Sequence, residues 1–111
     1  MKVLFVCSAN VDRSKTAEDF FAEQFTNIAF ESAGTNHSIC QQKGTNPLDQ
    51  DFLDNADLTL VMEQKHLNWM KENLNTKGKK IEILGIEDRY RYYSMELIEL
   101  LQRRCHSYFY E

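Results

Sequence analysis

Short apolar segments alternate with stretches of helical periodicity along the whole chain, and this alternation most constrains the fold. Short segments at residues 3–7, 28–32, 57–62 and 81–84 predict strands, and the apolar character of the first and third predicts that these two are buried. Hydrophobic residues at helical spacing predict helices over residues 14–25, 47–55 and 63–75, and a last helix that Ser94 caps. We therefore expect an α/β fold in which a four-stranded parallel sheet carries helices on both faces. The 111 residues suit a single domain spanning residues 1–111.

The charge and the hydropathy pattern exclude some partners. The net charge of -4 leaves no basic footprint, which argues against a nucleic-acid partner. The apolar run at residues 3–7 is too short for a secretory signal or a membrane span, and no other stretch qualifies. The sequence therefore predicts a cytoplasmic protein without a membrane partner. It leaves the oligomeric state open.

The cysteines and histidines follow no pattern of a disulfide scaffold or a metal site. Three widely spaced cysteines suit a reduced protein rather than a framework of disulfides. The three histidines lack metal-ligand spacing, so we predict surface histidines and no metal. The polar segment 36–45 is predicted to be a surface loop that contains Cys40, and Trp69 is predicted to lie in the core.

Cys7 ends the first predicted strand, and Arg13 follows it six positions later at the start of the first predicted helix. A thiolate there would face unpaired N–H groups and the positive end of the helix dipole. The backbone between the two residues is long enough to curl around one phosphoryl group, and the guanidinium of Arg13 can hold two of its oxygens. Asn10 suits a left-handed turn, and the hydroxyl of Ser14 can stabilise the thiolate.

The same spacing also allows a purely structural interpretation, in which Cys7 closes a buried strand and Arg13 begins a solvated helix. Position favours the phosphate-binding interpretation, because a strand–loop–helix junction is where phosphate-binding loops occur, and the structural interpretation stays open at this point. The predicted loop after residue 84 lies at the same edge of a parallel sheet as Cys7. Ligands of such folds bind beyond the carboxyl ends of the strands, at the switch point.

Four segments in order resemble the low-molecular-weight protein tyrosine phosphatases. These segments read V-L-F-V-C-S-A-N-V-D-R-S-K-T-A-E over residues 3–18, S-A-G-T over 32–35, A-D-L-T-L-V-M-E over 56–63 and I-E-D-R-Y over 86–90. The resemblance covers nearly the whole chain. The stretch between residues 35 and 56 is compressed, so the chain resembles a short bacterial branch of this family.

The resemblance implies a two-step phosphomonoesterase reaction through a phosphocysteine on Cys7, without a metal or organic cofactor. It implies that Arg13 is catalytic and that Asp88 is the general acid, with neighbouring Glu87 as the rival carboxylate. Its substrate would be a phosphotyrosine protein or a small aryl phosphate. The residues that would bind this substrate are Ser8, Ala9, Asn10, Val11, Asp12, Ser14 and Tyr90.

Several positions depart from the family pattern. Ala9 stands where glycine is usual, Lys15 where a proline is usual, and Arg89 where a proline follows the acid. Asp12 replaces a second cysteine of many members, so we predict that oxidation of Cys7 is not reversed through a neighbouring thiol. A carboxylate at position 12 would oppose phosphate only if it pointed into the loop.

Two other functions remain open at this stage. A catalytically weak phosphate- or phosphoprotein-binding module would retain the loop but lack efficient acid catalysis, and Arg89 favours that alternative. An arsenate reductase shares the fold and the loop, but it needs a close pair of additional cysteines, which Cys40 and Cys105 do not provide.

Overall fold

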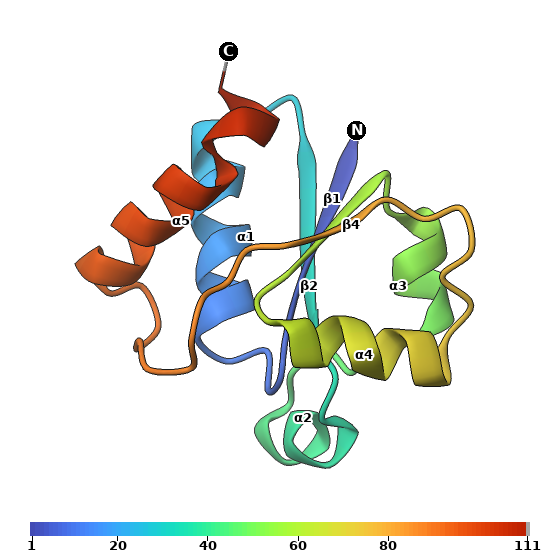
Figure 1. Cartoon of the computed structure of the whole chain (residues 1–111). Helices are drawn as coiled ribbons and strands as arrows, with labels where there is room; N and C mark the ends of the chain where they lie inside the picture. Colours follow the sequence, from blue (N-terminus) through green and yellow to red (C-terminus); the bar gives the residue numbers. More distant parts are fainter. Residues whose placement is uncertain (111) are drawn as a thin grey trace.

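The computed structural model describes residues 1–110 and contains a parallel sheet with the strand order β2-β1-β3-β4 (Figure 1). The predicted α/β class with four parallel strands is confirmed. In chain order, the elements are β1 (Lys2–Cys7), α1 (Arg13–Gln24), β2 (Ala29–Gly34), α2 (His37–Lys43), α3 (Gln50–Asn55), β3 (Leu58–Val61), α4 (Gln64–Asn73), β4 (Ile81–Ile83) and α5 (Met95–Phe109).

Strand β1 lies in the interior of the sheet, with β2 on one side and β3 on the other. Residues 3–6 of this strand are completely buried, which explains why its sequence is a continuous apolar run. The chain leaves β1 toward β2 and later returns to the opposite side for β3. The carboxyl end of β1, where Cys7 lies, is therefore at the switch point of the sheet.

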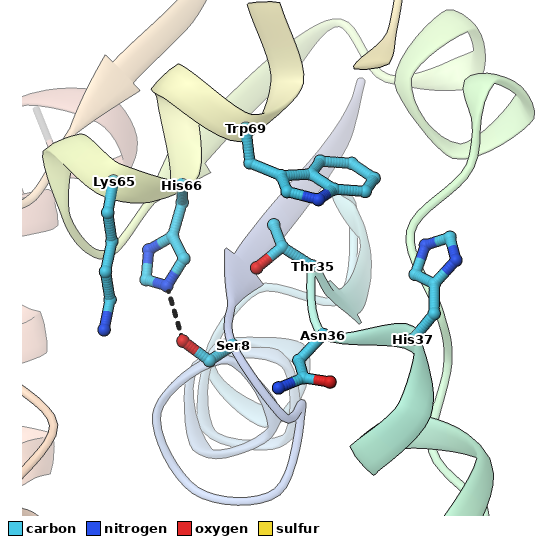
Figure 2. A pocket seen from close by; sticks show the side chains of 7 residues that line it. All are labelled: Ser8, Thr35, Asn36, His37, Lys65, His66 and Trp69. Atoms are coloured by element: carbon cyan, nitrogen blue, oxygen red, sulfur yellow. Dashed lines mark hydrogen bonds between the residues drawn. The ribbon is translucent and has the colours of Figure 1, made fainter. Parts of the chain in front are cut away.

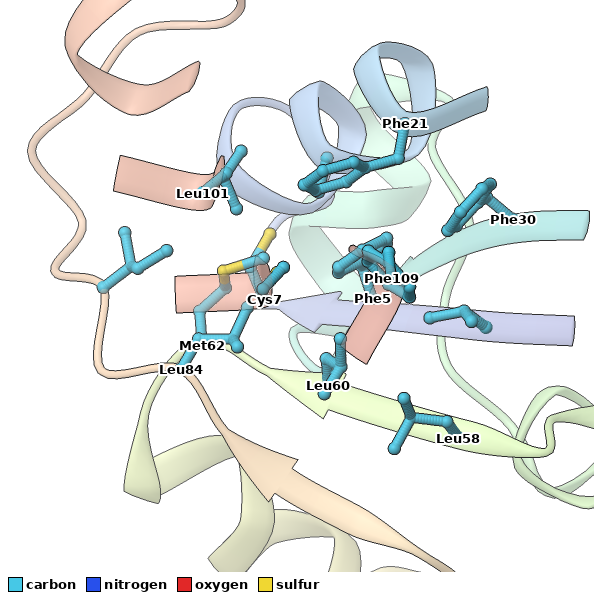
Figure 3. Close-up of a cluster of buried hydrophobic side chains, with 14 of the residues drawn as sticks. Phe5, Cys7, Phe21, Phe30, Leu58, Leu60, Met62, Leu84, Leu101 and Phe109 are labelled. Carbon is cyan, nitrogen blue, oxygen red and sulfur yellow. The ribbon is translucent and has the colours of Figure 1, made fainter. Parts of the chain in front are cut away.

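Two hydrophobic clusters cover the two faces of the sheet. The first packs α1 and α5 against β1, and its centre is a group of aromatic rings that includes Phe5, Phe21 and Phe109 (Figure 3). The second joins α3 and α4 to the other face through Leu53 and Met70. Aromatic side chains bury large apolar areas, so the first cluster fixes α1 firmly against β1. The loop between these two elements consequently has rigid ends.

The segment 36–45, predicted to be a surface loop, contains helix α2, so that prediction was wrong. Asn36 caps the helix by accepting a hydrogen bond from the Ile39 N–H (3.2 Å), and Gly44 ends it with a φ of 70°. Cys40 is completely buried on this helix. The helix has seven residues and buries only Cys40, so it has no hydrophobic period that the sequence could reveal.

Within residues 1–110, no helix has the length and apolar character needed to cross a lipid bilayer. The same residues contain no group of three or more histidine, cysteine, aspartate or glutamate side chains that could hold a metal ion.

Candidate active site

Residues 8–12, here called the cradle loop, connect the end of β1 to the start of α1. The Cys7 side chain is only 3% exposed, and its Sγ lies 3.0 Å from Oγ of Ser14. The Ser14 hydroxyl already accepts a hydrogen bond from Nδ2 of Asn10 (2.7 Å). The Ser14 hydrogen can therefore point to the sulfur, which favours the thiolate form.

Asn10 holds the shape of the cradle loop. Its φ of 58° is left-handed, a conformation that asparagine adopts more readily than most residues. The buried side chain also donates to Oγ of Ser32 (2.8 Å) and accepts from the N–H of Asn46 (3.1 Å). The turn predicted at Asn10 is present, and three segments of the chain are fixed to it.

The carbonyl groups at the start of the cradle loop bond to segments outside it. The carbonyls of residues 7–9 accept hydrogen bonds from the Thr35 N–H (3.0 Å), the Asn36 N–H (2.9 Å) and the Thr45 hydroxyl (2.7 Å). Within the described chain, none of the N–H groups of residues 8–12 donates to another protein atom. Such a set of free N–H groups at the start of a helix is an anion-binding arrangement.

Arg13 is the largest fully buried polar side chain beside this loop, with 1% exposure. Its Nη1 donates to Oε2 of Glu63 (2.5 Å) and to the carbonyl of Ile86 (2.8 Å). Its Nε lies 3.7 Å from Oδ1 of Asp88. Arg13 thus joins the cradle loop to residues 84–94, here called the acid loop. Burial acts to raise the pKa of Glu63, but the hydrogen bond and charge of Arg13 outweigh it and hold that pKa below its usual value.

The acid loop brings Asp88, rather than Glu87, to Arg13. The Arg89 N–H donates to the Glu87 carbonyl (3.0 Å) and closes a tight turn around Asp88. A proline at position 89 has no N–H and could not make this bond. The Asp88 side chain is 61% exposed. The guanidinium of Arg89 stacks over the ring of Tyr90 at 5.3 Å, and that ring also packs partly against the first hydrophobic cluster.

His66 lies beside the cradle loop, although it was not among the site residues predicted from the sequence. It was predicted to be a surface histidine, and that prediction is wrong. Its side chain is 1% exposed, and its Nδ1 accepts the Glu63 N–H (3.0 Å). Its other nitrogen, Nε2, therefore carries the hydrogen and donates to Oγ of Ser8 (3.0 Å), as Figure 2 shows. Burial lowers the pKa of His66 to about 4, so the ring is neutral. The available signal was the four-residue spacing to Met70, which is buried on the same face of α4.

A cavity of about 580 Å³ adjoins the cradle loop (Figure 2). The ring of Trp69, predicted to lie in the core, is half-buried and stands 5.4 Å from the ring of His37. Lys65 supplies a cation at the other side of the cavity. The lining residues, none of them acidic, are Ser8, Thr35, Asn36, His37, Lys65, His66 and Trp69.

The other predicted residues lie in or beside the cradle loop. Ala9 and Val11 are half-buried, and Ala9 adopts this turn in spite of its methyl group. The Asp12 carboxylate does not turn into the loop, because its Oδ1 accepts the N–H of Tyr92 (2.8 Å). The structure therefore brings together the predicted residues from Cys7 to Ser14 and Asp88. It places Tyr90 outside the group that lines the adjoining cavity.

Several solved structures with a similar arrangement of elements are named phosphatases. The tyrosine phosphatase Wzb from Escherichia coli K30, in complex with phosphate, is 23% identical with a TM-score of 0.75, covering 96% of this chain and 94% of that one. A low-molecular-weight protein tyrosine phosphatase from Bacillus subtilis is 22% identical with a TM-score of 0.68, covering 96% and 98%. The YwlE arginine phosphatase, in a variant with a phosphorylated active-site serine, is 22% identical with a TM-score of 0.68, covering 96% and 94%.

No protein-family model matches the sequence, and no curated protein matches it. The likeness therefore comes from the structure, and it extends over almost the full length of the chain and of the solved structures. The chain has the fold of the low-molecular-weight protein tyrosine phosphatases.

Proposed function

We propose that the protein is a cysteine-dependent phosphomonoesterase that acts on phosphotyrosine in proteins or on small aryl phosphates. The observation that carries this proposal is the cradle loop itself. Its first carbonyls are bonded outward, its N–H groups have no acceptor among residues 1–110, and Cys7 and Arg13 stand at its two ends. This combination supplies a nucleophile, an anion cradle and a buried cation at one point.

The first step transfers the phosphoryl group to sulfur. A lone pair of the Cys7 thiolate attacks phosphorus while the bond from phosphorus to the phenolic oxygen breaks. The free N–H groups of residues 8–12 and the guanidinium of Arg13 stabilise the charge on the remaining oxygens. Asp88, in its protonated form, donates its proton to the departing phenolate.

The second step regenerates the thiolate. Asp88, now a carboxylate, takes a proton from a water molecule while that water attacks phosphorus. The phosphorus–sulfur bond breaks, its electron pair returns to Cys7, and inorganic phosphate leaves. Ser14 stabilises the thiolate as a leaving group through the contact at 3.0 Å.

The cavity beside Ser8 supports an aromatic leaving group. Its half-buried Trp69 and the ring of His37 offer aromatic surface, and Lys65 offers a cation for an acidic group near the phosphorylated residue. One solved structure with this fold is named an arginine phosphatase, so phosphoarginine is the alternative to exclude. Peptides carrying phosphotyrosine, phosphoarginine or phosphoserine at the same position test the choice. Faster hydrolysis of the phosphoarginine peptide would contradict the proposed substrate class.

Hydrolysis of 4-nitrophenyl phosphate tests the reaction class directly. We expect the wild type to release phosphate and Cys7→Ser to have no turnover, because an alcohol at this site is a far weaker nucleophile. The matched control is Cys105→Ser, a buried cysteine of α5 outside the cradle loop. Trapping of a phosphorylated cysteine in rapidly quenched wild-type enzyme would support the intermediate. Turnover in Cys7→Ser at the wild-type rate would refute the proposal.

A second candidate function is a phosphate- or phosphoprotein-binding module. The exposure of Asp88, and the arginine that follows it where the family has proline, favour this alternative. Vanadate or phosphate binding measured by calorimetry separates the two functions. Tight binding together with no Cys7-dependent hydrolysis of any aryl phosphate would establish the binding module.

The cysteines support a reducing compartment, which we propose is the cytoplasm. All three cysteines are free and buried. Burial raises the pKa of the Cys105 thiol to about 12, so this residue is a poor candidate for the thiol relay of an arsenate reductase. Arsenate-dependent oxidation of a dithiol reductant by the protein would contradict this view.

A further inference from the structure

Asp12 stands at the N-cap position of α1, just before Arg13, but its side chain does not cap that helix. An aspartate in this position usually accepts a hydrogen bond from an N–H of the first turn. Here the side chain makes no such bond. Its Oδ1 instead accepts the N–H of Tyr92 at 2.8 Å, across a sequence separation of 80 residues. The carboxylate therefore serves the acid loop rather than its own helix.

Two further bonds from α1 hold the same end of the acid loop. The Thr16 hydroxyl accepts the N–H of Tyr93 (2.8 Å), and the Tyr92 hydroxyl donates to Oδ2 of Asp19 (2.6 Å). Tyr93 has a φ of 59°, a left-handed conformation that is strained for a residue with a bulky side chain. Such a conformation persists only where neighbouring groups enforce it. The bonds from α1 supply that constraint.

The other end of the acid loop is held by different side chains. Arg13 donates to the carbonyl of Ile86, and Arg104 on α5 donates to the carbonyl of Leu84 (2.6 Å). Asp88 lies between these two fixed ends. A proline after the acid would restrict the backbone of Asp88 directly. With Arg89 in that place, the constraint on Asp88 has to come from the fixed ends of the loop.

From these contacts we propose that Asp12 is a positioning residue, whose carboxylate holds the end of the acid loop and thereby keeps Asp88 above the cradle loop. The inference rests on the proposed phosphatase function. It gives a role to the residue that stands where relatives have a second cysteine. It also explains why a carboxylate is compatible with a phosphate site here, since Oδ1 is engaged by an N–H outside the cradle.

The test uses two esters that differ in their need for an acid. Release of phenolate from phenyl phosphate requires a proton, whereas release of 4-nitrophenolate depends on it much less. We expect Asp12→Ala to lower kcat/KM for phenyl phosphate roughly tenfold more than for 4-nitrophenyl phosphate. Asp12→Asn, which keeps the accepting oxygen but not the charge, should restore the wild-type ratio to within about twofold.

The control for loss of one carboxylate is Asp51→Ala, at an exposed position on α3. This variant should leave both rates and their ratio unchanged. If Asp12→Ala does not fold, Asp12→Ser serves in its place, because its shorter side chain does not reach the Tyr92 N–H. An equal loss on both esters in the Ala or Ser variant would overturn the proposal. A ratio in Asp12→Asn as low as that in Asp12→Ala would also overturn it.

Hydrogen exchange of the Tyr92 amide separates this proposal from the proposed function. The measurement needs no activity, so it decides the role of Asp12 even if the wild type hydrolyses neither ester. We expect the amide to exchange roughly tenfold faster in Asp12→Ala than in the wild type, and at the wild-type rate in Asp12→Asn. An unchanged exchange rate in Asp12→Ala would show that the carboxylate does not hold the loop.

Discussion

The cradle loop and the acid loop meet at Arg13, yet they are built in opposite ways. The cradle loop joins a buried strand to a helix, and its carbonyls and the side chain of Asn10 are bonded to other segments. The acid loop follows the short edge strand β4, and its exposed centre carries Asp88. Its bonds to the rest of the chain gather near its two ends.

This difference suggests which parts of the site tolerate substitution. A group that must surround phosphate from several sides needs a fixed backbone, so the cradle loop keeps a residue suited to a left-handed turn at Asn10. A proton donor needs only one well-placed oxygen. The acid loop can therefore exchange a proline for Arg89, provided that its ends are held.

The largest effect expected in the acid loop is on the rate and not on stability. Asp88→Asn should reduce kcat/KM for phenyl phosphate by roughly 10²–10⁴-fold, the usual contribution of a general acid. Its free energy of unfolding should change by less than about 0.5 kcal/mol, because the side chain is mostly exposed. Steady-state kinetics and urea denaturation measure the two quantities.

Glu87→Gln is the matched variant for this prediction. Glu87 is exposed and adjoins Asp88 in the sequence, but the oxygen that approaches Arg13 belongs to Asp88. We expect Glu87→Gln to retain the wild-type rate to within about threefold. A large loss in Glu87→Gln together with normal activity in Asp88→Asn would show that Glu87, and not Asp88, is the general acid.

In the cradle loop, the corresponding effect should be on stability. Asn10→Ala places an alanine at a φ of 58° and removes the bonds to Ser14, Ser32 and the Asn46 N–H. We expect a loss of about 3 kcal/mol in the free energy of unfolding, measured by urea denaturation.

Asn10→Gly separates the two causes of that loss. Glycine accepts the left-handed conformation, so only the missing hydrogen bonds remain, and the variant should be more stable than Asn10→Ala by about 1 kcal/mol. Equal stability of the two variants would show that the backbone conformation contributes nothing. Wild-type stability in both would contradict the role assigned to Asn10.

The parts of the site predicted from the sequence are those whose positions follow from residues that are close together in the chain. Cys7, Asn10 and Arg13 follow a buried strand and begin a helix, and a strand–loop–helix junction has few possible geometries. The sheet was predictable for the same reason, because its buried strands are continuous apolar runs.

The parts that escaped prediction depend on contacts between distant segments. No local pattern indicates that Asp12 bonds to Tyr92, 80 residues away. His66 is polar, and its burial follows from two specific bonds, to the Glu63 N–H and to Ser8. Helix α2 lacks a hydrophobic stripe, and Cys40 is its one buried side chain. Such tertiary contacts override local propensity.

The buried histidine should make the cradle side of the site sensitive to acid. The pKa of His66 falls from 6.5 to about 4 on folding, chiefly through burial and also through the charge of Arg13. Between these values the unfolded chain binds a proton that the folded chain does not, so stability decreases as the pH falls. From about pH 7.5 to about pH 5, the loss on this account is about 2 kcal/mol.

His66→Gln isolates that contribution. Glutamine keeps a side-chain N–H for Ser8 but does not titrate, so the variant should lose about 2 kcal/mol less than the wild type over the same pH interval. Glu63, whose pKa is also held low, loses its stabilising charge mainly at pH values below its ordinary 4.5 and does not obscure the comparison. Identical pH dependence in the wild type and the variant would mean that His66 is protonated in the folded protein.

The smallest effect should come from the exposed hydroxyl at the end of the acid loop. Tyr92→Phe removes the hydrogen bond to Asp19 but leaves the backbone N–H that Asp12 accepts. Because both side chains are in contact with solvent, we expect a loss of stability of at most about 1 kcal/mol. The rate on phenyl phosphate should stay within about twofold of the wild type. A loss of kcat/KM for phenyl phosphate as large as that in Asp12→Ala would mean that the loop is held through the tyrosine side chain rather than through its backbone.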